Sequence, residues 1–169
     1  EVVLIEQRKL PHIFELTRAQ TVAQTARAIT NMTVRGAGAI GATAAYGLAQ
    51  GARAFTGKTE AAFARNLQRA YDTLAAARPT AVDLVNALNQ VRAAMSAGKT
   101  TTSISQKQKL ALRAAQQFAD DDVAHCEAIG KHGAKLIENG TRVLTHCNAG
   151  WLAFVDIGSA TAPMYAAQA

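Results

Sequence analysis

Cysteine is scarce in this sequence, which has only Cys126 and Cys147 among its 169 residues. Two widely spaced cysteines form neither a disulfide framework nor a zinc motif, and the pattern suits a reducing compartment such as the cytoplasm. The four histidines add no paired spacing typical of a metal site. The sequence therefore predicts no metal and no disulfide-stapled fold.

Aromatic residues are also rare, at 5% of the chain, and proline occurs only three times. Few aromatic side chains and abundant alanine favour closely packed helices over a β-sandwich. No apolar run approaches the length that spans a membrane, and no secretory leader pattern opens the sequence. We therefore expect a soluble protein with no membrane partner.

Clusters of cationic residues are missing too. The 18 lysines and arginines contribute to a net charge of +6, but the longest basic run is Arg8-Lys9. A nucleic-acid-binding protein usually gathers such residues in a patch or stripe, so nucleic acid is not an expected partner. The excess charge favours solubility and is compatible with a small anionic ligand.

The sequence does have enough apolar residues, 49%, to build one sizeable core. Two short extended segments, 2–5 and 12–16, are separated by a break at Pro11 and predict a hairpin. An apolar face with helical spacing then recurs over residues 22–31, 39–55, 63–74, 84–95 and 103–138. The expected fold class is α/β overall, with a mainly helical domain over residues 1–138.

Helix starts are predicted where a serine or threonine is followed three positions later by a polar residue that completes the cap. Three pairs have this spacing: Thr17 with Gln20, Thr80 with Asp83, and Ser103 with Gln106. Residues 98–102 are the only linker-like segment, so the longest helix should begin at its end.

One candidate anion site lies at residues 34–41 (VRGAGAIG). Arg35 precedes a Gly-Ala-Gly turn that opens a helix, so its guanidinium and free backbone N–H groups could converge on a phosphate. The pattern is neither G-x-G-x-x-G after a strand nor a P-loop, so it gives little support for a nucleotide. For the glycines alone, close helix packing is the favoured interpretation.

Three other features have structural interpretations. Arg78 stands beside a proline at a corner between two helices, and by itself it is typical of a solvated arginine. Cys126 falls on the apolar stripe of the longest helix and is expected to pack in the core. The acidic run 120–122 on the same helix is expected to form a solvated face.

The most informative segment is residues 143–150 (VLTHCNAG). Its apolar start lies between two glycine turns and predicts a buried strand that ends near Cys147. Ligands of open α/β sheets bind beyond the carboxyl ends of strands, so Cys147 is a candidate functional thiol, with a small packing residue as the equal alternative. One strand cannot satisfy its own backbone groups, so we expect further chain or another polypeptide to complete the sheet.

Three segments in this order carry a family resemblance: residues 34–41 (VRGAGAIG), 77–84 (ARPTAVDL) and 144–150 (LTHCNAG). Over essentially its whole length, the chain closely resembles the N-terminal half of methylthioribose-1-phosphate isomerases. These enzymes of methionine salvage are related to the regulatory subunits of translation initiation factor 2B. The resemblance implies that residues 139–169 begin a Rossmann-like domain, with its first strand and helix, and that the enzyme is a cytoplasmic homodimer without a cofactor.

The resemblance also implies roles for individual residues. Arg35, Gly36 and Ala37 match the phosphate-binding R-G-A of the family, Arg78 matches a second substrate-binding arginine, and Cys147 matches the catalytic cysteine. The implied reaction converts 5-methylthioribose 1-phosphate into 5-methylthioribulose 1-phosphate. Fixed arginines can hold the phosphate, whereas the hydrogen transfer needs an acid/base group such as Cys147, beside an aspartate expected later in the family pattern.

Two positions depart from the family pattern, which commonly has proline where this chain has Gly38 and asparagine where it has Asp83. The first change loosens the anion-binding turn, and the second places a negative charge near it. Two other functions therefore stay open: an isomerase of another sugar 1-phosphate, such as 5-deoxyribose 1-phosphate, and a non-catalytic regulatory subunit. The intact T-H-C-N-A-G segment favours the enzyme.

Overall fold

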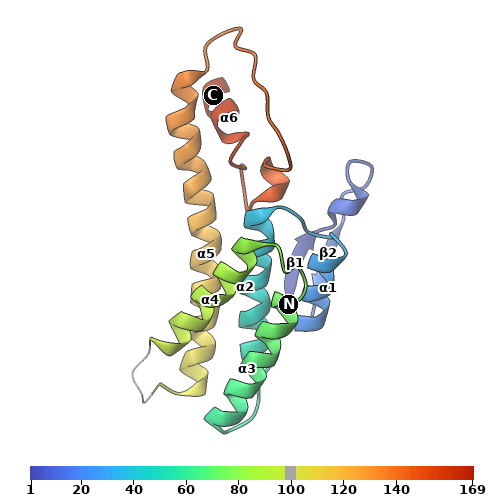
Figure 1. The fold of residues 1–169 in the computed structure, drawn as a ribbon, viewed down its shortest axis with the longest axis vertical. Coiled ribbons are helices and arrows are strands. Elements are labelled where there is room, and N and C mark those ends of the chain that lie inside the picture. The colour runs from blue at the N-terminus through green and yellow to red at the C-terminus, as the bar shows by residue number, and fades with distance from the viewer. Residues whose placement is uncertain (98–101) are drawn as a thin grey trace.

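The computed structural model describes residues 1–97 and 102–169, and shows a small sheet beside an elongated bundle of helices (Figure 1). Strand β1 (Val2–Ile5) pairs antiparallel with β2 (Leu16–Ala19). The predicted hairpin is thus confirmed, although its second strand begins four residues later than expected. The linker predicted at 98–102 lies outside the described residues except for its last position.

The helical part of the prediction is also confirmed. Six α-helices occur among the described residues: α1 (Val22–Thr30), α2 (Ala37–Arg53), α3 (Glu60–Ala75), α4 (Val82–Ser96), α5 (Ile104–Gly133) and α6 (Ala162–Gln168). None of these helices is long and apolar enough to cross a membrane.

Helix α2 is the centre of the bundle, and it packs against α1, α3, α4 and α5. Alanine and glycine make up most of its sequence, and 13 of its 17 residues are buried, so neighbouring helices approach its backbone closely. A Cβ added at Gly47 would lie 2.9 Å from Thr25 Cγ2, and one added at Gly51 would lie 2.8 Å from Ala70 Cβ. The glycines of α2 therefore serve close helix packing, the interpretation favoured from the sequence.

Only one of the three predicted helix caps forms as expected. Ser103 and Gln106 make a complete capping box at the start of α5. Thr17 instead lies in β2, where its hydroxyl donates to Glu6 Oε2 at 3.3 Å, and Thr21 caps α1 by accepting from the Gln24 N–H. At α4 the cap residue is Ala81, without a side-chain hydrogen bond, so the cap predicted at Thr80 is wrong.

The buried strand predicted at residues 143–144 is wrong for this chain. Residues 141–146 have no regular structure, and the Leu144 side chain is 96% exposed. The physical reason is that no other strand in the described part of the chain lies beside this segment, so its backbone has no ladder partner. The chain then returns to the bundle through a 3₁₀ turn, η3 (Trp151–Ala153), and α6, which packs on α5.

Candidate functional site

The turn that carries Arg35 opens helix α2, as predicted, two residues earlier than expected. Gly36 is the N-cap residue with a φ of +105°, and no side chain caps the helix. The N–H groups of Ala37 and Gly38 find no acceptor, and the exposed Arg35 guanidinium has no ion-pair or hydrogen-bond partner, among the described residues. A free guanidinium beside an uncapped helix N-terminus is a suitable environment for a phosphate.

Arg78 lies at the same end of the bundle. Thr30, at the end of α1, donates through its hydroxyl to the Ala77 carbonyl at 3.2 Å, which places the α3–α4 corner next to the loop leading to Arg35. A Cβ added at Gly41 of α2 would lie 3.2 Å from the carbonyl oxygen of Asp83 in the first turn of α4. The N-termini of α2 and α4 therefore meet there (Figure 1). Arg78 is partly exposed and, within the described residues, its side chain makes no ion pair.

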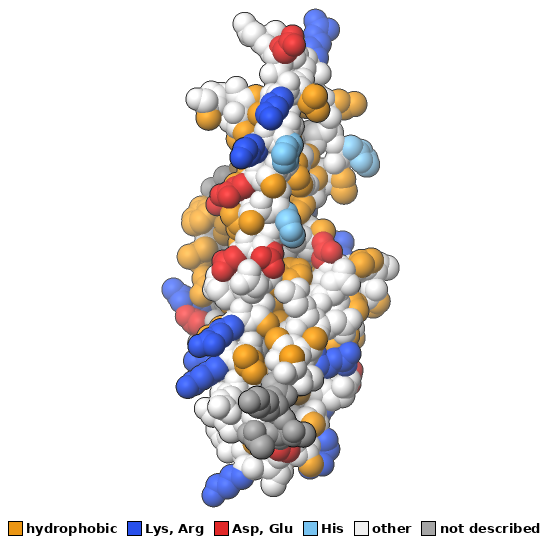
Figure 2. Space-filling view, turned by 90° about the vertical axis from the view of Figure 1, so that its left-hand side faces the viewer, with side chains coloured by type: hydrophobic (Ala, Val, Ile, Leu, Met, Phe, Trp, Pro, Cys, Tyr) orange, Lys and Arg blue, Asp and Glu red, His pale blue; other side chains and the backbone are white. Residues whose placement is uncertain are grey.

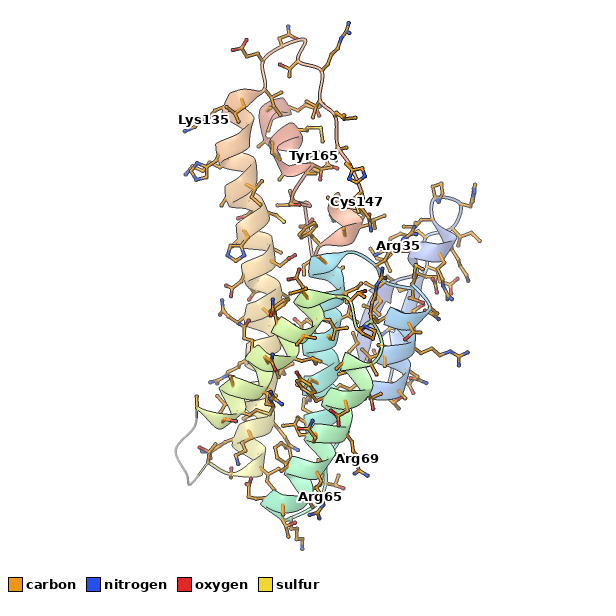
Figure 3. All side chains as sticks on the ribbon, in the orientation of Figure 1. Arg35, Arg65, Arg69, Lys135, Cys147 and Tyr165 are labelled. Atoms are coloured by element: carbon orange, nitrogen blue, oxygen red, sulfur yellow. The ribbon has the colours of Figure 1, made fainter. Side chains whose placement is uncertain are left out.

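Cys147 lies on the exposed segment before η3, at the same end of the bundle as Arg35 (Figure 3). No hydrogen bond joins its side chain to Arg35 or Arg78 within the described part of the chain. Its φ of +67° is uncommon for a residue with a side chain, and such backbone strain often occurs at functional sites. The structure thus places the thiol near the predicted phosphate-binding end without direct contact.

The segment after Cys147 packs directly on the α2 turn. A Cβ added at Gly36 would overlap the Cα of Ala153. A Cβ added at Gly38 would overlap Asp122 Oδ1 and would lie 2.8 Å from Phe154 Cδ1. Position 38 therefore cannot carry a Cβ unless Asp122 moves, which gives the departure from the family pattern a structural reason. Both glycines permit a close approach, as the packing interpretation predicted, and Gly36 also needs its positive φ.

Two residues that hold this segment were missed in the sequence. Gln7 Nε2 donates to the Leu152 carbonyl at 2.7 Å, and Asp122 Oδ2 accepts from the Val155 N–H at 2.7 Å. Gln7 has no pattern that predicts such a role. Asp122 was included in the solvated acidic run, and that interpretation is wrong for it because the side chain is half-buried against the returning segment.

Electrostatics at this end are mixed. Burial raises the pKa of Asp122, the nearby Asp83 carboxylate raises it further, and the Val155 N–H opposes both effects. Figure 2 shows acidic side chains gathered midway along the face that α5 presents, with cationic side chains toward both ends. Cys126 is buried, which confirms that it packs in the core, and this burial raises the pKa of its thiol.

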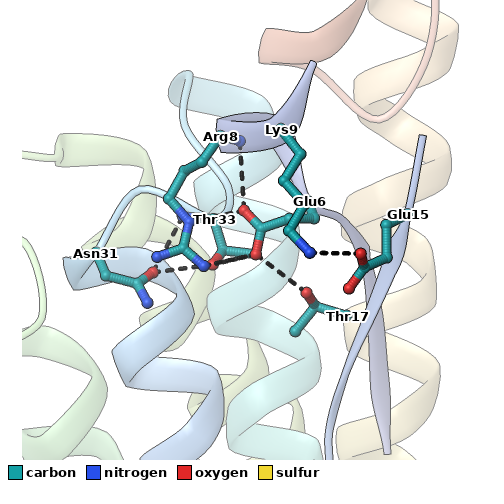
Figure 4. Close-up of polar contacts among 7 residues, drawn as sticks. All are labelled: Glu6, Arg8, Lys9, Glu15, Thr17, Asn31 and Thr33. Carbon is teal, nitrogen blue, oxygen red and sulfur yellow. Dashed lines mark hydrogen bonds and ion pairs between the residues drawn. The ribbon is translucent and has the colours of Figure 1, made fainter. Parts of the chain in front are cut away.

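An ion pair between the buried Glu6 and the half-exposed Arg8 supports the loop that leads to Arg35 (Figure 4). Glu6 is 3% exposed and accepts from the Arg8 guanidinium at 2.6 and 2.7 Å, and Thr33 Oγ1 donates to Glu6 Oε2 at 3.4 Å. The Thr33 backbone N–H donates to Asn31 Oδ1 at 3.1 Å. The network thus joins the end of β1 to the residues immediately before the α2 turn.

We expect this ion pair to make stability fall in acid. The hydrogen bond from Arg8 lowers the pKa of Glu6 from 4.5 to about 2. Because the pKa is lower in the folded state, the ionised Glu6 carboxylate contributes its full stabilisation above pH 4.5. This contribution to the free energy of unfolding is lost as the pH falls toward 2. The loss should be roughly 2 kcal/mol, after allowing for water around the half-exposed Arg8. Denaturant unfolding between pH 6 and 3 should show less pH dependence for Glu6→Gln than for the parent; equal dependence would contradict this.

An apolar groove of about 350 Å³ lies behind the returning segment. Its walls come from β1, α2, α5 and residues 151–155, and none of the five predicted site residues lines it. The groove lies beside the α2 turn, because Val34 and Ala39, on either side of residues 35–37, line it. No cluster of three or more metal-ligating side chains occurs within residues 1–97 and 102–169.

Comparison with known proteins identifies related chains. The model of the Initiation factor 2 subunit family matches residues 33–168. The methylthioribose-1-phosphate isomerase of Methylorubrum extorquens is 44% identical, over 98% of this chain and 45% of its own. The 5-deoxyribose 1-phosphate isomerase of Moorella thermoacetica is 42% identical, over 98% of this chain and 47% of its own.

Two solved structures share the fold. The crystal structure of 5-methylthioribose 1-phosphate isomerase from Pyrococcus horikoshii has a TM-score of 0.88 and 38% identity, covering 97% of this chain and 46% of that one. The subunit delta structure of translation initiation factor eIF-2B from A. fulgidus has a TM-score of 0.87 and 39% identity, covering 98% and 48%. The chain thus spans about half the length of the proteins it matches.

Proposed function

We propose that this chain, which belongs to the Initiation factor 2 subunit family, is the N-terminal half of an isomerase that converts 5-methylthioribose 1-phosphate into 5-methylthioribulose 1-phosphate. The observation that carries the proposal is the close packing of the segment after Cys147 on the turn that begins at Arg35. This packing supports a site in which the α2 N-terminus would bind the phosphate while the segment that carries the thiol packs against the same turn. Isomerases among the relatives support the same substrate class.

The chemistry suits these residues. Ring opening breaks the bond between C1 and the ring oxygen, and that oxygen takes up a proton. The hydrogen on C2 then moves to C1 while the C2 hydroxyl gives up its proton, so C2 is oxidised to a ketone while C1 is reduced and keeps its phosphate. The substrate supplies both electrons and hydrogen, so the scheme needs no cofactor. Arg35 and Arg78, with the N–H groups of Ala37 and Gly38, would hold the phosphate; Cys147 would act as acid/base or stabilise developing charge.

The proposal extends to the complete protein. Residues 1–138 would form the helical domain, and residues 139–169 would begin a Rossmann-like domain whose other strands pair with the extended segment before Cys147. We also propose a homodimer in the cytoplasm. Both cysteines are free, which suits a reducing compartment.

Two relatives favour specific alternatives, and one assay separates them. The Moorella enzyme favours 5-deoxyribose 1-phosphate as substrate, and the A. fulgidus structure favours a regulatory subunit. Turnover of the complete protein should be measured with both sugar phosphates. A higher kcat/KM for the methylthio sugar supports the proposal, a higher value for the deoxy sugar replaces its substrate, and no turnover with either favours the regulatory subunit.

Replacing either arginine by lysine should weaken substrate binding although the charge is kept. A planar guanidinium can hold two phosphate oxygens, whereas an ammonium holds them less specifically. Loss of one charge-assisted hydrogen bond costs about 1.5–3 kcal/mol, which is about one to two decades in affinity. Arg35→Lys and Arg78→Lys should each raise KM and the inhibition constant of inorganic phosphate, with the exposed Arg69→Lys on α3 as control. An unchanged KM and an unchanged inhibition constant of phosphate would mean that the arginine is solvated and does not bind the substrate.

A further inference from the structure

Residues 152–155, on the segment that follows Cys147, contact three parts of the N-terminal domain: Gln7, the α2 turn and helix α5. The four contacts are Leu152 with Gln7, Ala153 with Gly36, Phe154 with Gly38, and Val155 with Asp122. The outer two are hydrogen bonds of 2.7 Å, and the inner two are close approaches to glycine. The segment is therefore fixed at both ends by polar contacts and in the middle by shape.

Gln7 has an unusual position among these contacts because it joins both parts of the candidate site. Its backbone N–H donates to the Thr33 carbonyl at 3.0 Å, two residues before Arg35. Its side-chain Nε2 donates to the Leu152 carbonyl, five residues after Cys147. Gln7 is 5% exposed, and the Glu6–Arg8 ion pair holds the backbone on either side of it. One buried residue thus links the two segments.

Asp122 holds the other end of the segment from helix α5. Its Oδ2 accepts from Val155, while its Oδ1 occupies the space left by the missing Cβ of Gly38. An ionised carboxylate is only an acceptor of hydrogen bonds, and the Gln7 Nε2 group is only a donor. The two residues therefore hold the segment at the Leu152 carbonyl and at the Val155 N–H.

We propose that Gln7 and Asp122 are positioning residues, which together hold the Cys147 segment at a fixed place relative to the phosphate-binding turn. This inference rests on the proposed isomerase function, because the placement matters only if Cys147 acts on a sugar whose phosphate is held at that turn. Neither residue needs to touch the substrate. A misplacement of about 1 Å at a reacting group can cost about a hundredfold in rate, so modest loosening should be measurable.

The test uses the complete protein with Gln7→Met and Asp122→Ala. Each variant should lower kcat about tenfold or more while KM changes little, because the arginines that hold the phosphate are kept. Gln108→Met is the matched control: its Nε2 also donates to backbone carbonyls, those of Ala52 and Phe55, at 2.9 and 3.0 Å. It should lower the melting temperature comparably and leave kcat unchanged. Equal loss of kcat in the control would overturn the proposal.

Backbone hydrogen exchange gives a readout independent of turnover. The amides of residues 153–155 should exchange faster in Gln7→Met and Asp122→Ala than in the parent, and at the parental rate in Gln108→Met. Faster exchange without a loss of kcat, or unchanged exchange in both variants, would overturn the positioning role. A parent without turnover on either sugar phosphate would reject the proposed function instead, and exchange alone would then decide whether these residues hold the segment.

Discussion

Cys147→Ser in the complete protein should lower turnover by about two decades or more, the usual effect of losing an acid/base or charge-stabilising group. Substrate binding and melting temperature should change little, because serine is close to cysteine in size and the side chain is exposed. The loss should therefore appear in kcat rather than KM. Steady-state kinetics with thermal unfolding of the same preparations would measure both effects.

The second cysteine provides the control. Cys126 is 1% exposed on the inner face of α5, so Cys126→Ser places a hydroxyl in a buried site. This should cost about 1–3 kcal/mol of stability and spare turnover. Alkylation should modify Cys147 in the native protein and be slowed by substrate. Near-parental turnover of Cys147→Ser would leave the exposed thiol without a catalytic role.

Gly36→Ala should damage both stability and turnover. Alanine at a positive φ costs about 1–2 kcal/mol, and the new Cβ would overlap the Ala153 backbone, adding about 1–3 kcal/mol of overpacking. The overlap can be relieved only if the segment after Cys147 moves off the α2 turn. We therefore expect turnover to fall about a hundredfold as the thiol is displaced.

Gly140→Ala separates the cost of the positive φ from the cost of the overlap with Ala153. Gly140 also has a positive φ, +82°, but nothing lies within 4 Å of an added Cβ. It should show the backbone cost alone, measured as a smaller drop in the free energy of unfolding, with turnover retained. Similar losses of turnover in both variants would mean that the contact between Gly36 and Ala153 is not important.

Local pattern was sufficient to predict most of the helical domain from sequence. The apolar spacing that predicts α1 to α5 depends only on residues of the same helix, and so does the capping box at Ser103. Prediction failed where tertiary contacts compete with local ones. Thr17 has the spacing of a cap, but its hydroxyl bonds to Glu6 across the hairpin. The strand at residues 143–144 needs a neighbouring strand that no local signal supplies.

The candidate site was predictable only in part, for the same reason. Arg35 and Gly36 could be predicted because a turn that opens a helix is a local feature. Gln7 could not, because its role depends on a hydrogen bond to a residue 145 positions away. Asp122 shares a charged run with two aspartates that pair with glutamines on their own helix, and its half-buried position appears only once the chain returns to α5.

The alanine- and glycine-rich sequence of α2 has a consequence for mutational tolerance. Such residues have no side-chain rotamers to freeze, so packing around this helix costs little side-chain entropy and offers few alternative arrangements. Most cores lose stability chiefly when side chains are shortened. Here the harmful substitutions should be enlargements, because a Cβ at Gly47 already meets Thr25 and Leu74. A saturation scan of α2 should therefore rank residues by volume, with serine tolerated better than leucine at its buried small positions.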